Sequence, residues 1–266
     1  MLNKKFIAAL GLCLTFGLSL MAQATVDSSR VIKVLTFNIL HGANTNKTFD
    51  LDIIAKVIQD ADPDFVALQE VDYKTERAKK YDLVTELGWR TKMTPLYGRA
   101  MYYDGGEYGE GILSKHTFLN TRNVALPYNP GDEPRAALEI TTVLPSNDTI
   151  SFIGTHLDHL KVEDNKIMQA KKINEVFILN KYPTILAGDL NAEPGSTTMR
   201  ILQSAWTTSF TNTDPEPTYS STEPTKKIDY VLFRPQHKWQ VLHTKTICDT
   251  IASDHCAYLV TLLLID

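Results

Sequence analysis

The chain has 266 residues and a formal net charge of −4, from 27 basic and 31 acidic side chains. That length is enough for one large domain with a buried core, and the 43% of hydrophobic and 22% of charged residues exclude a disordered or collagen-like chain. The acidic balance argues against a surface that binds nucleic acid through bulk positive charge.

The first 24 residues have the three parts of a secretory signal peptide. Lys4 and Lys5 give a positive start, residues 6–21 are almost uncharged and apolar, and Ala22-Gln23-Ala24 resembles a cleavage site. The alternative is a retained membrane anchor, but the apolar run is shorter than the roughly 20 residues that span a bilayer. We therefore expect a secreted or periplasmic mature chain of residues 25–266 without an integral membrane segment.

Apolar patterns predict alternating strands and helices after this segment. Residues 31–39 are rich in Val, Ile and Leu, as in a strand. Apolar side chains recur at helical spacing over residues 51–58, and Asp50 can cap that helix. The short apolar run at residues 65–68 predicts a buried strand, and residues 75–87 are expected to be helical.

The middle of the chain has short β-rich runs separated by turn residues, which predicts antiparallel hairpins between residues 97 and 155. The remaining expected elements are a helix at 167–177, strands at 183–187, 228–233 and 257–264, and a surface loop at 209–225. Without an internal repeat or a linker, residues 25–266 are predicted to form a single domain. Its expected fold is a four-layer α/β sandwich, with two packed, mostly antiparallel sheets flanked by helices.

Two cysteines, Cys248 and Cys256, follow the signal segment. Export would allow them to form a disulfide. We favour the alternative that both are buried free thiols, which pack as small apolar side chains.

Carboxylate, amide and imidazole side chains recur at the ends of the predicted strands. One such residue means little, because Asp and Asn also begin turns, but strand ends at one edge of a sandwich converge in space. The recurring residues are Asn38, Gln69, Glu70, His156, Asp158, Asp189, Asn191, Asp229, Asp254 and His255.

This set of residues predicts a reaction. Hard oxygen ligands suit Mg²⁺ or Mn²⁺, with Ca²⁺ as a third candidate. Such a cation neutralises a phosphoryl group and activates water, and a histidine beside a carboxylate can bind a phosphate oxygen as a cation. No Gly-x-Ser-x-Gly nucleophile motif or zinc-spaced Cys/His pattern is present. Metal-dependent hydrolysis of a phosphate ester by water fits these residues.

Seven motifs in chain order resemble the endonuclease/exonuclease/phosphatase superfamily, a group of metal-dependent phosphoesterases. The resemblance covers essentially the whole mature chain. The motifs are Thr36-Phe37-Asn38-Ile39, Leu68-Gln69-Glu70-Val71-Asp72, Gly111-Ile112-Leu113-Ser114, Thr155-His156-Leu157-Asp158, Gly188-Asp189-Leu190-Asn191-Ala192, Ile228-Asp229-Tyr230-Val231 and Ser253-Asp254-His255.

The resemblance implies a metal and a water site. Glu70 would be the main metal ligand, helped by Asn38 and Asp254. Asp189 would orient or deprotonate the attacking water, and Asn191 would hold that water or a phosphate oxygen.

The resemblance also implies a phosphate site. Asp229 would orient and charge His255, which would bind the scissile phosphate, while His156 would stabilise the pentacovalent phosphate. Arg135 and Asp158 are the predicted substrate-binding residues, with a surface charge and an ordinary turn residue as their alternatives. The other histidines match no motif and are expected to be structural or solvated; they are His41, His116, His159, His237 and His243.

One departure from the family affects the substrate. Many relatives have Gly-Asn-Ala where this chain has Gly109-Glu110-Gly111, and an added carboxylate would disfavour a polyanion. A monomeric phosphodiesterase or phosphatase for a lipid or sugar headgroup is therefore the leading hypothesis. A secreted endonuclease acting on nucleic acid is the second, with aromatic and cationic residues near Tyr97–Tyr108 as its support. A non-catalytic binding protein of the same fold is the third.

Overall fold

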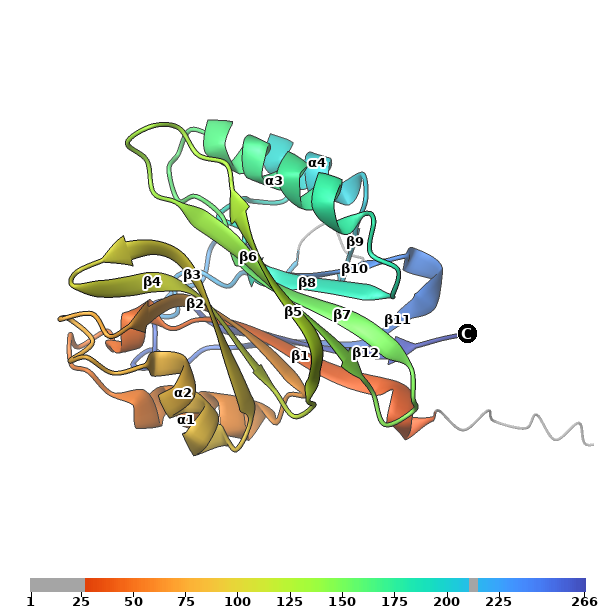
Figure 1. The fold of residues 1–266 in the computed structure, drawn as a ribbon, viewed down its shortest axis with the longest axis horizontal. Helices are drawn as coiled ribbons and strands as arrows, with labels where there is room; N and C mark the ends of the chain where they lie inside the picture. Colours follow the sequence, from red (N-terminus) through yellow and green to blue (C-terminus); the bar gives the residue numbers. More distant parts are fainter. Residues whose placement is uncertain (1–26, 211–214) are drawn as a thin grey trace, which may run out of the picture.

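The computed structural model describes residues 27–210 and 215–266, in which twelve strands form two six-stranded sheets (Figure 1). The predicted signal peptide at residues 1–24 lies outside the described residues. Among the helices of the described ranges, none is long and apolar enough to cross a membrane.

The first sheet has the strand order β11-β12-β1-β2-β4-β3. β1 and β2 are parallel, and every other neighbouring pair is antiparallel. Its strands are β1 (Val31–Asn38), β2 (Phe65–Tyr73), β3 (Thr94–Tyr103), β4 (Gly106–Ser114), β11 (Trp239–Ile247) and β12 (Ala257–Leu264).

The second sheet has the order β5-β6-β7-β8-β10-β9, and here β7 and β8 form the parallel pair. Its strands are β5 (Phe118–Leu126), β6 (Arg135–Val143), β7 (Thr149–His156), β8 (Thr184–Asp189), β9 (Thr207–Thr208) and β10 (Asp229–Arg234).

The helices cover the two outer faces, so the predicted four-layer sandwich is confirmed. α1 (Leu51–Ala61) and α2 (Leu83–Thr91) pack on the first sheet, and α3 (Asp164–Phe177) and α4 (Thr197–Gln203) pack on the second (Figure 1). Large apolar side chains such as Phe65 and Phe152 fill the space between the sheets. Short 3₁₀ turns occupy Ser28–Arg30, Leu40–Gly42 and Gln236–Lys238.

One predicted helix is wrong in its position. Residues 76–80 form turns, in which Lys79 and Lys80 take left-handed backbone angles that end any helix there. α2 begins only at Leu83, because the side chain of Asp82 accepts a hydrogen bond of 3.2 Å from the Thr85 N–H. Strand β11 and helix α4 were not expected from the sequence.

The expectation of free thiols is also wrong. Cys248 and Cys256 form a disulfide, with their Cα atoms 4.2 Å apart. The reason lies in the register of the last two strands. Ile247 pairs with Ala257 across β11 and β12, so the next residues of the antiparallel pair, the two cysteines, face each other directly.

The register also brings the predicted site residues together. His156 pairs with Asp189 across β7 and β8, and Asp189 pairs with Asp229 across β8 and β10. On the facing sheet, β1 ends at Asn38 beside Gln69 of β2. The polar strand ends of both sheets therefore meet at one edge of the sandwich.

Candidate active site

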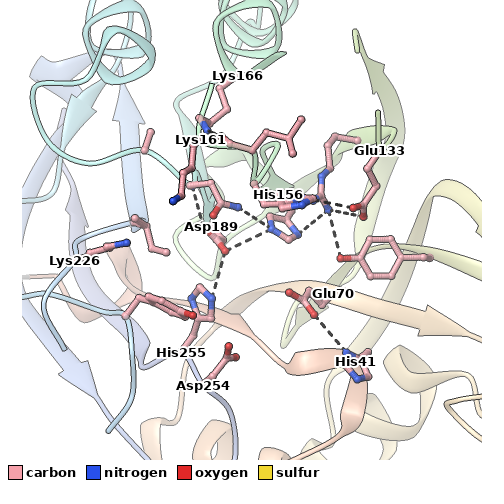
Figure 2. A pocket seen from close by; sticks show the side chains of 18 of the residues that line it. His41, Glu70, Glu133, His156, Lys161, Lys166, Asp189, Lys226, Asp254 and His255 are labelled. Carbon is pink, nitrogen blue, oxygen red and sulfur yellow. Dashed lines mark hydrogen bonds and ion pairs between the residues drawn. The ribbon is translucent and has the colours of Figure 1, made fainter. Parts of the chain in front are cut away.

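A cleft of ≈960 Å³ opens at this edge (Figure 2). Asn38 and Asp229 are buried behind its walls, and their bonds to cleft residues are described below. The predicted site residues that line the cleft are Glu70, Arg135, His156, Asp189, Asn191, Asp254 and His255.

Asp189 lies at the centre of the site and contacts four other site residues. Its Oδ2 atom lies 3.5 Å from Nε2 of His156 and 3.6 Å from Nε2 of His255. The same oxygen accepts a 3.3 Å hydrogen bond from Nδ2 of Asn38, and Oδ1 accepts one of 2.9 Å from the Asn191 N–H. Burial and the charge of Asp229 raise the pKa of Asp189, which makes this carboxylate a stronger proton acceptor.

His255 lies between two carboxylates. Its Nδ1 is 3.1 Å from Oδ2 of the fully buried Asp229, and its Nε2 faces Asp189. Burial alone would lower the pKa of His255, but the charges of Asp229 and Asp189 outweigh burial and raise it to about 10. His255 is therefore a cation at neutral pH.

His156 has the opposite character. Its Nδ1 lies 3.1 Å from Nη1 of Arg135, and its Nε2 lies 3.1 Å from the side-chain nitrogen of Asn191. Burial and the charge of Arg135 hold the pKa of His156 well below its usual range, so this ring is neutral. Arg135 and the amide nitrogen of Asn191 can only donate, so each ring nitrogen of His156 faces a donor, and Nε2 also faces Asp189.

Arg135 is not a surface charge, since only 2% of it is exposed. Its Nη1 is 3.3 Å from Oε1 of Glu133 and 3.4 Å from the hydroxyl of Tyr108. These contacts hold a guanidinium group beside the neutral His156, where it can face an anionic substrate.

Glu70 lies on β2 of the first sheet, opposite the sheet that carries Asp189. Burial raises the pKa of Glu70, but hydrogen bonds from His41 and Asn38 outweigh burial and lower it. Its oxygen Oε1 accepts a 3.1 Å bond from Nδ2 of Asn38, whose Oδ1 accepts from the Leu40 N–H. This orientation of the amide makes Asn38 a residue that positions Glu70, whereas the sequence suggested a direct metal ligand.

The carboxylates of Glu70 and Asp254 both reach the cleft, and they fit a divalent cation that prefers oxygen ligands. A second group, Asp189, Asp229 and His255, brings its ligand atoms within 4.8 Å of one another. In this second group the protonated ring of His255 already supplies the positive charge between Asp189 and Asp229. In the described part of the chain, Glu70 belongs to no such preformed group of three.

Asp158 is not brought into the cleft. It is fully buried; its Oδ2 accepts a 3.1 Å bond from Nδ2 of Asn165, and its N–H donates to Gln169. These partners tie the end of β7 to α3. Its predicted contact with substrate therefore finds no support in the geometry.

The sequence motifs missed several cleft residues, among them His41, His159 and Tyr219. His41 lines the cleft, with Nδ1 3.5 Å from Oε2 of Glu70, and His159 lies 3.3 Å from Arg135. The ring of Tyr219 lies 4.8 Å from that of His255, inside the segment expected to be a surface loop. The sequence signal for His41 was its place beside Gly42, directly after the strand that carries Asn38; Tyr219 had no signal.

Glu110 lies on β4 and does not line the cleft. Its carboxyl is fully buried, and neither oxygen has a hydrogen-bond partner among the described residues. Burial raises its pKa well above the usual range, so the group is uncharged. An uncharged carboxyl does not repel an anion, so the expected repulsion of a polyanion by Glu110 is not supported.

The family profile described as "Endonuclease/Exonuclease/phosphatase family" matches residues 35–255. The chain belongs to this family. No curated protein matches the chain.

Solved structures share the fold. A family member from Beutenbergia cavernae DSM 12333 has 22% identity and a TM-score of 0.74, over 88% of this chain and 72% of its own. A mannosyl-6-phosphatase of Bacteroides thetaiotaomicron VPI-5482 has 16% identity and a TM-score of 0.71, over 88% and 100%. ANGEL2, a 2',3'-cyclic phosphatase, has 15% identity and a TM-score of 0.66, over 87% and 95%.

Proposed function

We propose that the protein is an exported, metal-dependent hydrolase that cleaves phosphate esters by attack of water. The observation that carries this proposal is the position of Asp189. Its Oδ2 lies within 3.6 Å of a cationic and a neutral histidine, and Nδ2 of Asn38 bonds both to it and to Glu70.

Each residue has a distinct part in this reaction. Asp189 accepts the proton of the attacking water, because burial and Asp229 raise its pKa toward that task. His255 holds a phosphate oxygen as a cation, and the neutral His156 lies beside the same carboxylate of Asp189, next to Arg135. A divalent cation held by Glu70 and Asp254 would neutralise phosphate charge and activate water.

The lining of the cleft favours a small substrate. Six carboxylates face five fixed cations and the cationic His255, so the side chains supply no excess positive charge for a long polyanion. The carboxylates are Glu70, Glu133, Glu163, Asp189, Glu193 and Asp254, and the fixed cations are Arg77, Arg135, Lys161, Lys166 and Lys226. A sugar phosphate or a lipid headgroup is thus the proposed substrate class, and the likeness to a mannosyl-6-phosphatase supports it.

A nuclease is the second candidate. Tyr102, between the cleft residues Met101 and Tyr103, is 74% exposed, and the guanidinium of Arg99 lies 4.2 Å from its ring centroid. Such a pair could stack on a base. Arg99 is neutralised, however, by Glu107 at 2.9 Å.

Export has two supports. The first is the predicted signal peptide at residues 1–24. The second is the disulfide between Cys248 and Cys256, because disulfides persist mainly in oxidising compartments.

A substrate panel tests the proposal. The mature protein is assayed with Mg²⁺ or Mn²⁺ on mannose 6-phosphate, inositol phosphates, sphingomyelin, bis-p-nitrophenyl phosphate and plasmid DNA, with Asp189→Asn as the control. We expect turnover of a small ester and loss of it in the variant. Turnover of plasmid DNA alone would favour the nuclease, and no turnover of any ester would favour the binding protein.

A further inference from the structure

His41 occupies a place that the proposed reaction does not use. Its side chain is 28% exposed and lines the cleft next to Glu70 (Figure 2). The two carboxylate oxygens of Glu70 have different neighbours: Oε1 faces Asn38, and Oε2 faces Nδ1 of His41.

The backbone holds His41 in an uncommon conformation. Leu40 and His41 have φ angles of 46° and 48°, in the left-handed region that non-glycine residues rarely adopt. Gly42 follows at φ 80°, and a Cβ atom there would lie 2.9 Å from the ring of Phe49. The Asp50 N–H also donates to the Gly42 carbonyl. Packing and hydrogen bonds therefore fix a strained turn that directs the imidazole at Glu70.

The separation of the two side chains is long for a hydrogen bond. Nδ1 of His41 lies 3.5 Å from Oε2 of Glu70, whereas N–H···O bonds are usually about 2.7–3.2 Å. Adjacent ligands of one cation with bonds of about 2.1 Å lie roughly 3.0–3.4 Å apart, in octahedral or tetrahedral geometry. The observed distance is close to that of two atoms sharing an ion.

We propose that Nδ1 of His41 is a ligand of the divalent cation held by Glu70, and that it makes the site prefer Mn²⁺ to Mg²⁺. The preference follows from ligand chemistry, because a transition-metal ion such as Mn²⁺ binds imidazole nitrogen more strongly than does Mg²⁺, which selects oxygen ligands. This inference rests on the proposed metal-dependent function.

Metal binding tests the inference without an activity assay. Metal-free protein is titrated by calorimetry with MnCl₂ and with MgCl₂, as wild type, His41→Asn and the control His159→Asn. Asn tolerates the left-handed backbone of position 41, and His159 lies in the same cleft against Glu133 and Arg135. His41→Gly, which adopts positive φ freely, replaces His41→Asn if that variant melts early.

We expect His41→Asn to weaken Mn²⁺ binding roughly tenfold or more, to change Mg²⁺ binding much less, and His159→Asn to change neither. The electron spin echo of bound Mn²⁺ should lose a nitrogen coupling in the His41 variants alone. Equal weakening of both metals, or a retained coupling, would overturn the assignment of His41 and leave the proposed function standing. Failure of the wild type to bind either metal would overturn both.

Discussion

Nδ1 of His255 lies 3.1 Å from Oδ2 of Asp229, a carboxylate with no exposed surface. The pair joins the last site motif to the start of β10, 26 residues earlier in the chain. Because Asp229 cannot reach the cleft itself, any contribution it makes to catalysis must pass through the charge and orientation of the His255 ring.

We predict that Asp229→Asn damages catalysis severely and leaves the fold intact. The amide keeps the shape of the side chain but removes the charge that holds the pKa of His255 high. Loss of a charged contact to the transition state costs about 2.7–4 kcal/mol, by analogy with oxyanion-hole deletions, which is roughly a hundred- to thousandfold in kcat/KM.

The measurement combines kcat/KM with thermal unfolding. Asp64→Asn makes the same chemical change at the start of β2, where Asp64 accepts a bond from the Lys33 N–H, and it should keep wild-type activity. Near-normal activity of Asp229→Asn, or inactivity explained by unfolding, would contradict the dyad.

Metal removal should abolish activity. Glu70 and Asp254 present hard oxygen ligands to the cleft, so EDTA should stop turnover, and Mg²⁺ or Mn²⁺ should restore it. Glu70→Gln should prevent that restoration at metal concentrations that saturate the wild type. Full activity after exhaustive chelation would exclude the metal-dependent mechanism.

The sequence predicted which side chains gather at this edge of the sandwich, because both the residue types and the strand ends could be recognised in it. Asp189 and His156 each end an apolar run, and strand ends at one edge of a sandwich meet. The fold followed from the same patterns of apolar residues, and the family resemblance placed the motifs in the right order.

The errors have physical causes. Residues 75–87 have the composition of a helix, but Asp82 caps a later one. The disulfide depends on the register between β11 and β12, which the spacing of two cysteines does not encode. His41 and Tyr219 reach the cleft through a left-handed turn and a long loop, and neither of these follows from periodicity.

Lys227 gives a prediction on the pH dependence of stability. Its Nζ lies 3.1 Å from the centroid of the Tyr258 ring and has no hydrogen-bond partner within the described residues. Burial lowers its pKa to about 7, although the charges of Asp229 and Glu216 act in the other direction. Unfolded lysine titrates near about 10.4.

Between about pH 7 and 10 the unfolded chain therefore binds a proton at Lys227 that the folded chain does not, so Lys227 contributes a rise with pH in the free energy of unfolding, opposite to the fall that His255 contributes over the same window. The slope from one group is at most about 1.4 kcal/mol per pH unit. Lys227→Met should remove this rise, as measured by urea unfolding at pH 7 and pH 9. The neighbouring Lys226→Met should keep this contribution, and a pH dependence in Lys227→Met equal to that of the wild type would show that Lys227 is charged in the fold.

The last prediction concerns the disulfide, which closes the short segment that carries Asp254 and His255. Cys248 and Cys256 are eight residues apart, and a loop of this size contributes roughly 2–3 kcal/mol to the free energy of unfolding. The double variant Cys248→Ala/Cys256→Ala should lose about that amount.

The same variant should also lose activity in conditions where it is fully folded, because the freed segment no longer holds His255 against Asp189. A displacement of about 1 Å in an active site can cost a hundredfold in rate, so we expect a tenfold to hundredfold fall in kcat/KM. Ile173→Ala is the control: it removes a buried side chain from α3, costs a comparable amount of about 2–5 kcal/mol, and leaves the segment closed. If both variants lose activity equally, global stability is the cause; if only the cysteine variant does, the disulfide positions the catalytic histidine.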